Sequence, residues 1–233
     1  MKINIIAEIG LNHLGDDKYL AEYLKILNKN KIDGISIQVP KKSLMKNSHK
    51  KYLLSNKKIS TFVKNVKENF RLVGITTSDI KKIDFFETLN LDFFKVTSGM
   101  IDNLKLINKM NKTKVKKIYL STGLTTIVNL KNILDKQKSK KIELIYTSFE
   151  KNIKKIDFER INLFKKIFKL PVAYGSHSYF KNTIPNAVFY KPSSIFFYVK
   201  LNKKLAYPDN KHAVNLSQLS KILDKIKNNL KKI

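Results

Sequence analysis

The sequence predicts a single (β/α)8 TIM barrel of the α/β class, on three observations. The chain has 233 residues, close to the ~250 typical of one such barrel. Short apolar runs alternate with amphipathic stretches along the whole chain, as in proteins with a parallel sheet. No glycine-rich dinucleotide motif follows a strand and no low-complexity linker divides the chain. Residues 1–233 are therefore expected to form one domain.

Eight apolar runs rich in β-branched residues are expected to form the strands. They are Ile3–Glu8, Gly34–Val39, Leu72–Thr76, Phe93–Thr97, Lys117–Ser121, Ile142–Thr147, Val172–Tyr174 and Ser194–Lys200. Between them, apolar residues recur at helical spacing. Candidate N-caps of these helices are Asp16 or Asp17, Ser78 or Asp79, Thr125 or Thr126, and Ser217. Eight alternating units in this length favour a closed barrel over an open sheet. The lysine-rich segment Pro40–Lys58 is expected to be a solvated loop or a mobile lid.

The composition predicts a cytoplasmic globular protein. Hydrophobic residues make up 42% of the chain, which argues against disorder. No apolar run approaches the ~20 residues needed to span a bilayer. The start, Met1–Glu8, is too short and too quickly acidic for a secretory signal. With no cysteine in the chain, disulfides, thiolate metal sites and cysteine nucleophiles are excluded.

The formal net charge of +29 raises the question of a nucleic-acid or anionic membrane partner. Only Arg71 and Arg160 among the 47 basic residues are arginines, and the lysines are spread along the chain. Nucleic-acid readers favour arginine for its bidentate contacts. An A/T-rich genome explains the lysine excess better, so we expect neither nucleic acid nor a membrane as partner. The charge would still attract anionic metabolites.

Each expected strand ends in polar side chains, and all eight carboxyl ends share one face of a barrel. Those suited to binding or catalysis are Glu8, Asn12, His13, Gln38, Thr77, Lys95, Ser98, Ser121, Thr147, Ser148 and His177. Individual hydroxyls could equally cap helices. As a set they predict a polar pocket for an oxygen-rich ligand.

Lys95 lies within an apolar strand, where a lysine is costly unless it meets an anion or a water-filled cavity. A buried ion pair or a snorkelling side chain would explain it equally well. Glu8 could likewise form a salt bridge at the barrel mouth. His13 and His177 follow the first and seventh strands, where a histidine serves as a ligand or as a structural residue. His49 and His212 have no such positional argument.

Several segments together resemble a known family. Residues 7–16 (Ala-Glu-Ile-Gly-Leu-Asn-His-Leu-Gly-Asp) closely resemble the opening motif of the sialic acid synthase (N-acetylneuraminate synthase) family. Further similar segments follow in the family's order at residues 94–99, 120–124, 147–148, 174–178 and 207–209. The resemblance covers nearly the whole chain and implies the catalytic barrel domain of that family.

The resemblance implies condensation of phosphoenolpyruvate with an N-acetylated amino sugar aldehyde to a 2-keto sugar acid, in carbohydrate biosynthesis. It implies a divalent metal, manganese or magnesium, that polarises the aldehyde. Glu8 and His13 would be catalytic, and His177 would bind the metal. Residues implied to bind substrate are Asn12, Gln38, Thr77, Lys95, Ser98, Ser121, Thr147, Ser148, Tyr174 and Asp209. A homodimer, or pairing with a separately encoded cap domain, is also implied.

The sequence departs from the family pattern at several positions of the implied pocket. Ser36 replaces a phosphate-binding lysine, Met100 a glutamate, and Tyr198 the second metal-binding histidine. Gly175 and Ser176 replace a serine and an aspartate. With the sequence ending at Ile233, we expect the family's carboxyl-terminal antifreeze-like domain to be missing. One histidine cannot hold a catalytic divalent ion tightly by itself.

Three hypotheses remain open from the sequence. The first is a divergent synthase-like enzyme that uses phosphoenolpyruvate. The second is a catalytically degenerate barrel that serves as a ligand-binding or partner subunit of a sugar-acid pathway. The third is a polyanion binder driven by net charge, with steep salt dependence.

Overall fold

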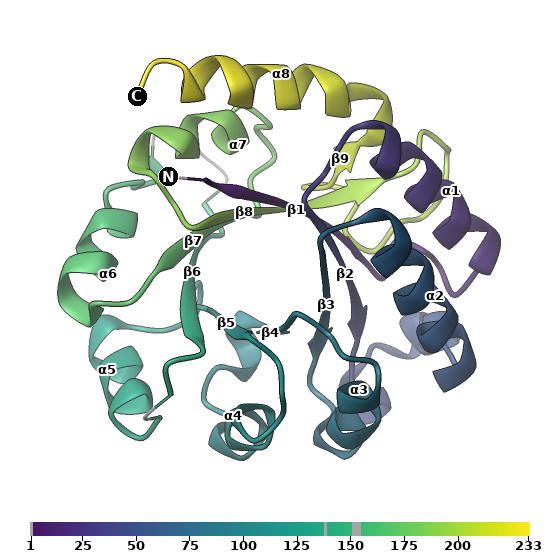
Figure 1. Cartoon of the computed structure of the whole chain (residues 1–233), viewed down its shortest axis with the longest axis horizontal. Coiled ribbons are helices and arrows are strands. Elements are labelled where there is room, and N and C mark those ends of the chain that lie inside the picture. The colour runs from purple at the N-terminus through teal and green to yellow at the C-terminus, as the bar shows by residue number, and fades with distance from the viewer. Residues whose placement is uncertain (1, 138, 151–154) are drawn as a thin grey trace.

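Eight parallel strands close into a barrel in the computed structural model, which describes residues 2–137, 139–150 and 155–233 (Figure 1). The strands are β1 (Asn4–Gly10), β2 (Gly34–Val39), β3 (Leu72–Thr77), β4 (Phe93–Val96), β5 (Lys117–Ser121), β6 (Ile142–Ser148), β7 (Val172–Ser176) and β8 (Ser194–Lys200). Each strand pairs with the next in sequence, and β1 pairs with β8 to close the ring. The predicted (β/α)8 fold is confirmed. A two-residue strand, β9 (Val214–Asn215), adds to β8.

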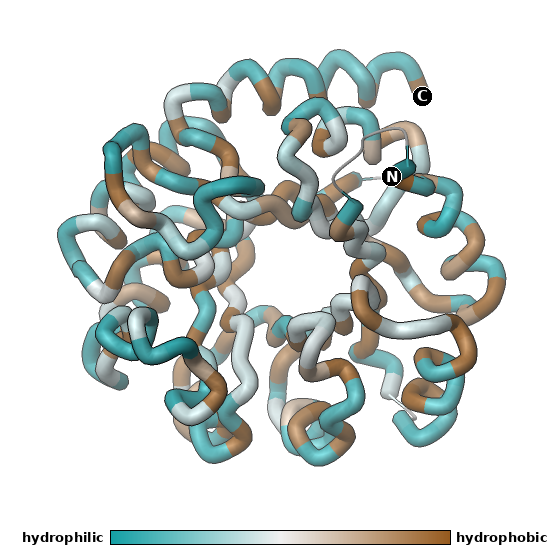
Figure 2. Tube along the Cα trace, turned by 180° about the vertical axis from the view of Figure 1, so that it is seen from behind, coloured by the Kyte–Doolittle hydropathy of each residue, from teal (hydrophilic) through white to brown (hydrophobic). Residues whose placement is uncertain are grey.

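Helices surround the barrel in alternation with the strands (Figure 1). They are α1 (Asp17–Lys29), α2 (Asn56–Asn69), α3 (Ile83–Thr88), α4 (Leu104–Asn111), α5 (Ile127–Asp135), α6 (Arg160–Phe168), α7 (Thr183–Asn186) and α8 (Leu219–Leu230). Asp16 and Thr126 cap α1 and α5 with their side chains, as predicted. Apolar residues recur along the helices at the spacing that faces the strands (Figure 2). No helix in the described ranges is long and apolar enough to cross a bilayer.

The start of the last helix differs from the prediction. Ser217 does not cap α8: the Asn215 side chain accepts from the Ser217 backbone N–H and opens a 3-10 turn, Leu216–Gln218, ahead of α8. Of the two candidates Ser78 and Asp79, Asp79 caps the turn that leads into α3.

Less of the segment Pro40–Lys58 is irregular loop than predicted. It contains two 3-10 helices, Lys42–Leu44 and Asn47–Tyr52. The α2 helix begins within it, because the Ser55 hydroxyl accepts from the Lys58 N–H and caps the first turn.

The barrel interior is divided into layers. Its middle layer is an apolar cluster formed by Ile6, Phe93, Tyr119, Ile145, Ala173 and Phe196. Three of these rings pack edge to face, with centroids 4.8–5.9 Å apart. Because side chains alternate along a strand, the residue two positions further on each strand also faces inward, nearer the carboxyl end. This next layer contains Glu8, Ser36, Thr76, Lys95, Ser121, Thr147, Gly175 and Tyr198.

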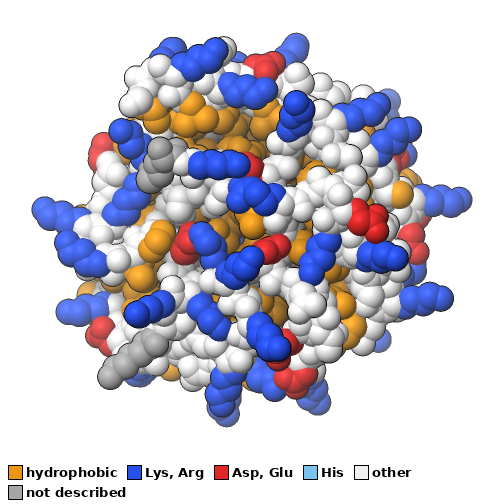
Figure 3. All heavy atoms as spheres, viewed as in Figure 1, with side chains coloured by type: hydrophobic (Ala, Val, Ile, Leu, Met, Phe, Trp, Pro, Cys, Tyr) orange, Lys and Arg blue, Asp and Glu red, His pale blue; other side chains and the backbone are white. Residues whose placement is uncertain are grey.

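The amino end of the barrel carries paired charges (Figure 3). Lys117 pairs with the buried Glu143, whose other oxygen accepts from the Ser193 hydroxyl at 2.9 Å. Asp33 pairs with Arg71 at 2.9 Å and with Lys2 at 3.4 Å. Each of these acidic groups therefore has a cationic partner close to solvent.

Candidate active site at the carboxyl end of the barrel

Glu8 and Lys95 form an ion pair across the barrel interior, from β1 to β4. The Lys95 Nζ lies 2.6 Å from both Glu8 carboxylate oxygens, and each side chain is only 3% exposed. The same ammonium lies 5.5 Å from the Phe196 ring centroid and 5.6 Å from that of Tyr198. Lys95 thus does meet a buried anion, one from its own chain. Removing two charges from water costs several kcal/mol per ion, so a buried ion pair is not by itself evidence that the fold is stabilised. A pair kept at that cost indicates that charged groups are needed at this position.

Three hydroxyls form a chain beside this pair. Ser98 Oγ donates to Ser121 Oγ at 3.0 Å, and Ser121 Oγ lies 2.9 Å from Thr147 Oγ1. Ser98 Oγ also accepts from the Gly123 N–H at 3.1 Å. A Cβ at Gly175 would come within 2.8 Å of Thr147 Oγ1, so glycine at 175 gives this chain its room.

Two further hydroxyls face the same interior without a partner. Ser36 pairs in register with Glu8, and Thr76 pairs with Lys95. Both side chains are buried, and neither hydroxyl finds a hydrogen-bond partner within the described residues. Sequence reasoning treated Ser36 only as a lost lysine and did not select Thr76. The alternation of β2 and β3 is the signal that would have placed both beside the pair.

Asn12 positions Asp209 at the same end of the barrel. Its Nδ2 donates to the Val199 carbonyl at 2.8 Å, while its Oδ1 accepts from the Asp209 N–H at 3.0 Å. Burial, with the Glu8 carboxylate adding to it, raises the pKa of Asp209 to about 7. Asn12 thus supports the backbone of Asp209, and the Asp209 carboxyl lies within electrostatic reach of Glu8.

Four rings gather where β6, β7 and β8 end. The His177 ring centroid lies 4.9 Å from Phe149, 5.4 Å from Tyr198 and 4.7 Å from His212. Burial lowers the pKa of His177 well below its usual range, and Lys95 and then His212 add to the effect. Burial and the nearby Lys181 lower the pKa of His212 to about 4. Both imidazoles are therefore neutral at physiological pH.

His212 is a further site residue that sequence reasoning did not select. Its Nε2 lies 3.5 Å from Asp209 Oδ1, three residues earlier in the chain. The spacing Asp-x-x-His in the segment between β8 and β9 is a sequence signal that could have indicated it.

The residues at this end do not fit the implied divalent ion. No three side chains of histidine, aspartate or glutamate in the described ranges lie where they could hold a metal. Tyr198, which the resemblance places at the family's second histidine, packs its ring against His177 at an interplanar angle of 66°. A catalytic site needs about three protein ligands, which this set does not supply.

Several residues predicted for the site lie elsewhere. His13 Nδ1 accepts from the Gly15 N–H at 2.9 Å, and its nearest charges are Asp17 and Lys58 at the start of α1 and α2. Burial, the largest cause, lowers the pKa of His13 to about 4. The described contacts of His13 thus lie at the start of α1, while its Nε2 is buried without a hydrogen-bond partner in the described residues.

Thr77, Tyr174 and Ser148 also point away from the interior. Thr77 Oγ1 donates to the Val39 carbonyl at 2.7 Å and so fixes the end of β3. Tyr174 lies in the outer core between strands and helices. The Ser148 hydroxyl accepts from the Glu150 N–H at 3.2 Å. Gln38, half-buried and paired with Thr76, lies at the rim of the interior.

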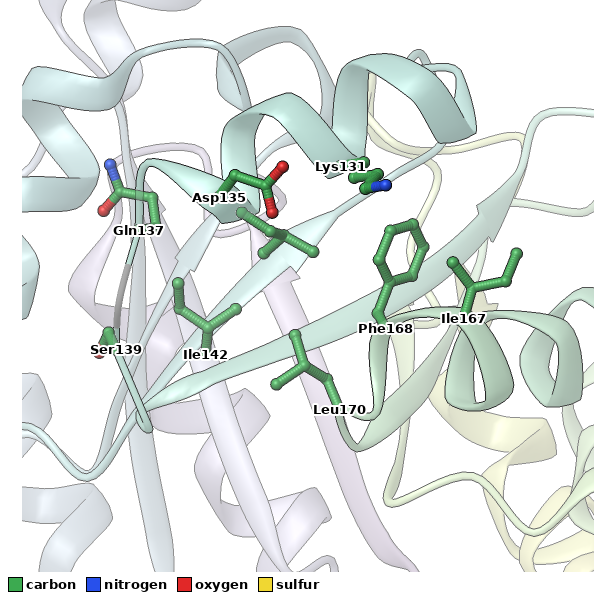
Figure 4. A pocket seen from close by; sticks show the side chains of 9 residues that line it. Lys131, Asp135, Gln137, Ser139, Ile142, Ile167, Phe168 and Leu170 are labelled. Carbon is green, nitrogen blue, oxygen red and sulfur yellow. The ribbon is translucent and has the colours of Figure 1, made fainter.

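A pocket of about 350 Å³ lies away from this site (Figure 4). It opens between α5 and α6 beside Ile142, the first residue of β6, and so at the amino side of the barrel. Its lining residues are Lys131, Leu134, Asp135, Gln137, Ser139, Ile142, Ile167, Phe168 and Leu170. Because none of the predicted site residues lines it, we do not assign the chemistry to this pocket.

A closed (β/α)8 barrel with ionisable side chains buried at the carboxyl ends of its strands has the architecture of barrel enzymes. The family model of the NeuB family matches residues 18–233. The chain belongs to the NeuB family.

The curated relatives agree with this assignment. The chain is 27% identical over 264 residues to the N,N'-diacetyllegionaminic acid synthase of Campylobacter jejuni, covering 97% of this chain and 76% of that protein. It is 30% identical over 187 residues to an uncharacterised protein of Methanocaldococcus jannaschii. That match covers 75% of this chain, but only 55% of the length of the relative.

Solved structures share the fold at lower identity. The N-acetylneuraminic acid (sialic acid) synthetase of Leptospira borgpetersenii, solved with citrate, gives a TM-score of 0.90 at 18% identity, over all of this chain and 85% of that one. A spore coat polysaccharide biosynthesis protein of Bacillus subtilis gives 0.87 at 17%, over 99% and 68%.

Proposed function

We propose that this chain is a synthase-like enzyme that condenses phosphoenolpyruvate with an N-acetylated amino sugar aldehyde and releases phosphate. The product would be a 2-keto sugar acid. Membership of the NeuB family supports a sugar-acid synthase-like function, and the C. jejuni relative is named for a synthase of this kind.

One observation carries the proposal: a buried ammonium and a buried carboxylate lie in contact beside a chain of hydroxyls. Lys95 directs two contacts to Glu8, and an ammonium has three N–H donors, so at least one remains for a ligand anion. The Thr76 hydroxyl, in register with Lys95, has no partner in the described residues, and the Ser98 hydroxyl would donate to a ligand by leaving Ser121. An ester of phosphate and a carboxylate needs such a mixture of cationic and hydroxyl donors.

The acidic groups suit the sugar side of the reaction. Glu8 lies beside the Lys95 ammonium, where it could exchange a proton with the aldehyde oxygen. Asp209, held by Asn12, would accept hydrogen bonds from sugar hydroxyls.

The experiment is phosphate release from phosphoenolpyruvate and a panel of 2-acetamido aldehyde sugars that includes N-acetylmannosamine, with and without Mn²⁺. We expect release with at least one sugar, and its loss in Lys95→Gln. The matched control is Lys117→Gln, which removes a lysine at the other end of the same barrel. Absence of release across the panel would overturn the proposal, as would full activity in Lys95→Gln.

A second candidate is a non-catalytic partner subunit of a sugar-acid synthase. The observation in its favour is that Glu8 already neutralises Lys95, beside Ser36, which replaces a lysine of the family pattern. It predicts a stable complex with a full-length NeuB-family synthase on size-exclusion chromatography. Turnover by this chain alone would exclude it. The same chromatography reports whether the chain forms a homodimer.

A further inference from the structure

Tyr198 stands at the centre of the candidate site. It pairs in register with Glu8 and follows the inward-facing Phe196 by two residues, so its ring faces the barrel interior. The residue is 5% exposed. Its ring centroid lies 5.4 Å from that of His177 and 4.9 Å from that of His212.

The backbone of β1 is shaped around this ring. Gly10 has a φ of +59°, and a Cβ there would lie 2.6 Å from Tyr198 Cε1 and 2.9 Å from Asp209 Oδ2. The absence of a side chain at Gly10 therefore lets the phenol and the Asp209 carboxyl approach the strand. The phenol ring occupies the space that faces the two histidines.

The phenol hydroxyl is uncommitted. Within the described residues, no hydrogen bond of this hydroxyl is found, while the charged groups around its ring are the Glu8 carboxylate, the Lys95 ammonium and the Asp209 carboxyl. A neutral phenol can donate a strong hydrogen bond where oxygen gains negative charge, as cations do.

We propose that Tyr198 takes the place of a divalent cation in this site: no such ion binds beside His177, and the phenol O–H donates to the carbonyl oxygen of the substrate. The claim that no divalent ion binds beside His177 is argued from the packing alone. The claim that the phenol donates to the substrate rests on the proposed function. In that reaction carbon 3 of phosphoenolpyruvate bonds to the aldehyde carbon, and the aldehyde oxygen takes the phenolic proton to become a hydroxyl.

The remaining atoms then balance. Water adds to carbon 2 of the resulting cation and returns a proton to the phenolate. The hydroxyl formed on carbon 2 becomes the ketone oxygen as the bond between carbon 2 and the phosphate ester oxygen breaks. Its proton leaves with the phosphate, and Tyr198 is restored.

The first test measures Mn²⁺ alone, by electron paramagnetic resonance, on the whole chain and on two variants. We expect no saturable binding to the unaltered protein up to about 1 mM, a range in which even weak protein sites fill. Tyr198→His is expected to gain a site, and Tyr198→His combined with His177→Ala is expected to lose it. Saturable binding by the unaltered protein that disappears in His177→Ala overturns the proposal, and so does a Tyr198→His variant that gains nothing.

The second test concerns the hydroxyl. After treatment with EDTA, the unaltered protein is expected to release phosphate, and Tyr198→Phe to lose about 10²–10³-fold in kcat, the effect of one lost donor to a developing oxyanion. The thermal midpoint of Tyr198→Phe should stay close to that of the unaltered protein, since the ring remains. Unchanged kcat in Tyr198→Phe, or turnover that requires Mn²⁺, overturns this half. If no sugar is turned over at all, the proposed function fails while the Mn²⁺ measurement still decides the first half.

Discussion

The two ends of this barrel treat charge in opposite ways. At the amino end, Glu143 and Asp33 pair with lysines and an arginine that reach solvent. At the carboxyl end, Glu8 and Lys95 are sealed from solvent, and the buried hydroxyls of Ser36 and Thr76 find no partner in the described residues. The same strands thus carry satisfied polar groups at one end and costly ones at the other. Costs of this kind are expected where a ligand supplies the missing contacts.

The largest effect should come from breaking the sealed pair. Lys95→Met leaves the Glu8 carboxylate buried and unpaired, and we expect a loss of about 3–5 kcal/mol in the free energy of unfolding. Combining it with Glu8→Leu should restore most of that loss. The matched change at the amino end, Lys117→Met, leaves the buried Glu143 with the Ser193 hydroxyl as a remaining donor, so it should cost less, about 1–2 kcal/mol. Urea denaturation measures all four proteins, and equal costs for the two lysines would refute the contrast between the ends.

A second effect should appear in the pH dependence of stability. Burial raises the pKa of Asp209 from 3.8 to about 7, so the folded protein holds a proton that the unfolded chain releases. The contribution of Asp209 is therefore full below about pH 4 and is lost as pH rises through 7. The histidines with lowered pKa act in the opposite direction: their contribution to the free energy of unfolding increases as pH rises.

Asp209→Asn removes the contribution of Asp209 to the pH dependence of stability and keeps that of the histidines. The difference in unfolding free energy, unaltered protein minus variant, should fall steadily between pH 4 and pH 7. Denaturation at several pH values measures it. A flat difference would mean that Asp209 is ionised and solvated like an aspartate at the surface.

The smallest expected change in stability concerns buried hydroxyls, and its sign should depend on whether the hydroxyl has a hydrogen-bond partner. Ser36→Ala removes an unpartnered buried hydroxyl and should stabilise the fold by about 1 kcal/mol. Ser121→Ala breaks the chain to Ser98 and Thr147 and should destabilise it by a similar amount. Thermal or urea denaturation gives both signs. If Ser36→Ala also destabilises, the Ser36 hydroxyl has a partner such as bound water.

The strand order and most strand positions were predictable because parallel strands leave continuous apolar runs. For the same reason, the sequence could not show which side of each strand faces the barrel interior, because both sides are buried. Hydrophobicity therefore does not distinguish Tyr174, which faces outward, from Gly175, which faces inward. Lys95 could be selected as unusual, but choosing between a ligand anion and Glu8 required the distance across the barrel. His212 lies in the segment after β8, whose path the sequence pattern does not fix.

The pairing of β1 with β8 has a consequence for how the protein is made. Glu8 emerges from the ribosome early, and its neighbour in register, Tyr198, is added 190 residues later. At about 5–20 residues per second, translation leaves the first strand waiting roughly 10–40 s for its partner. Contacts so distant along the chain also slow folding once synthesis ends. The nascent chain must therefore hold its apolar first strand, Asn4–Gly10, without the neighbour that closes the ring, a period when chaperones would be most useful.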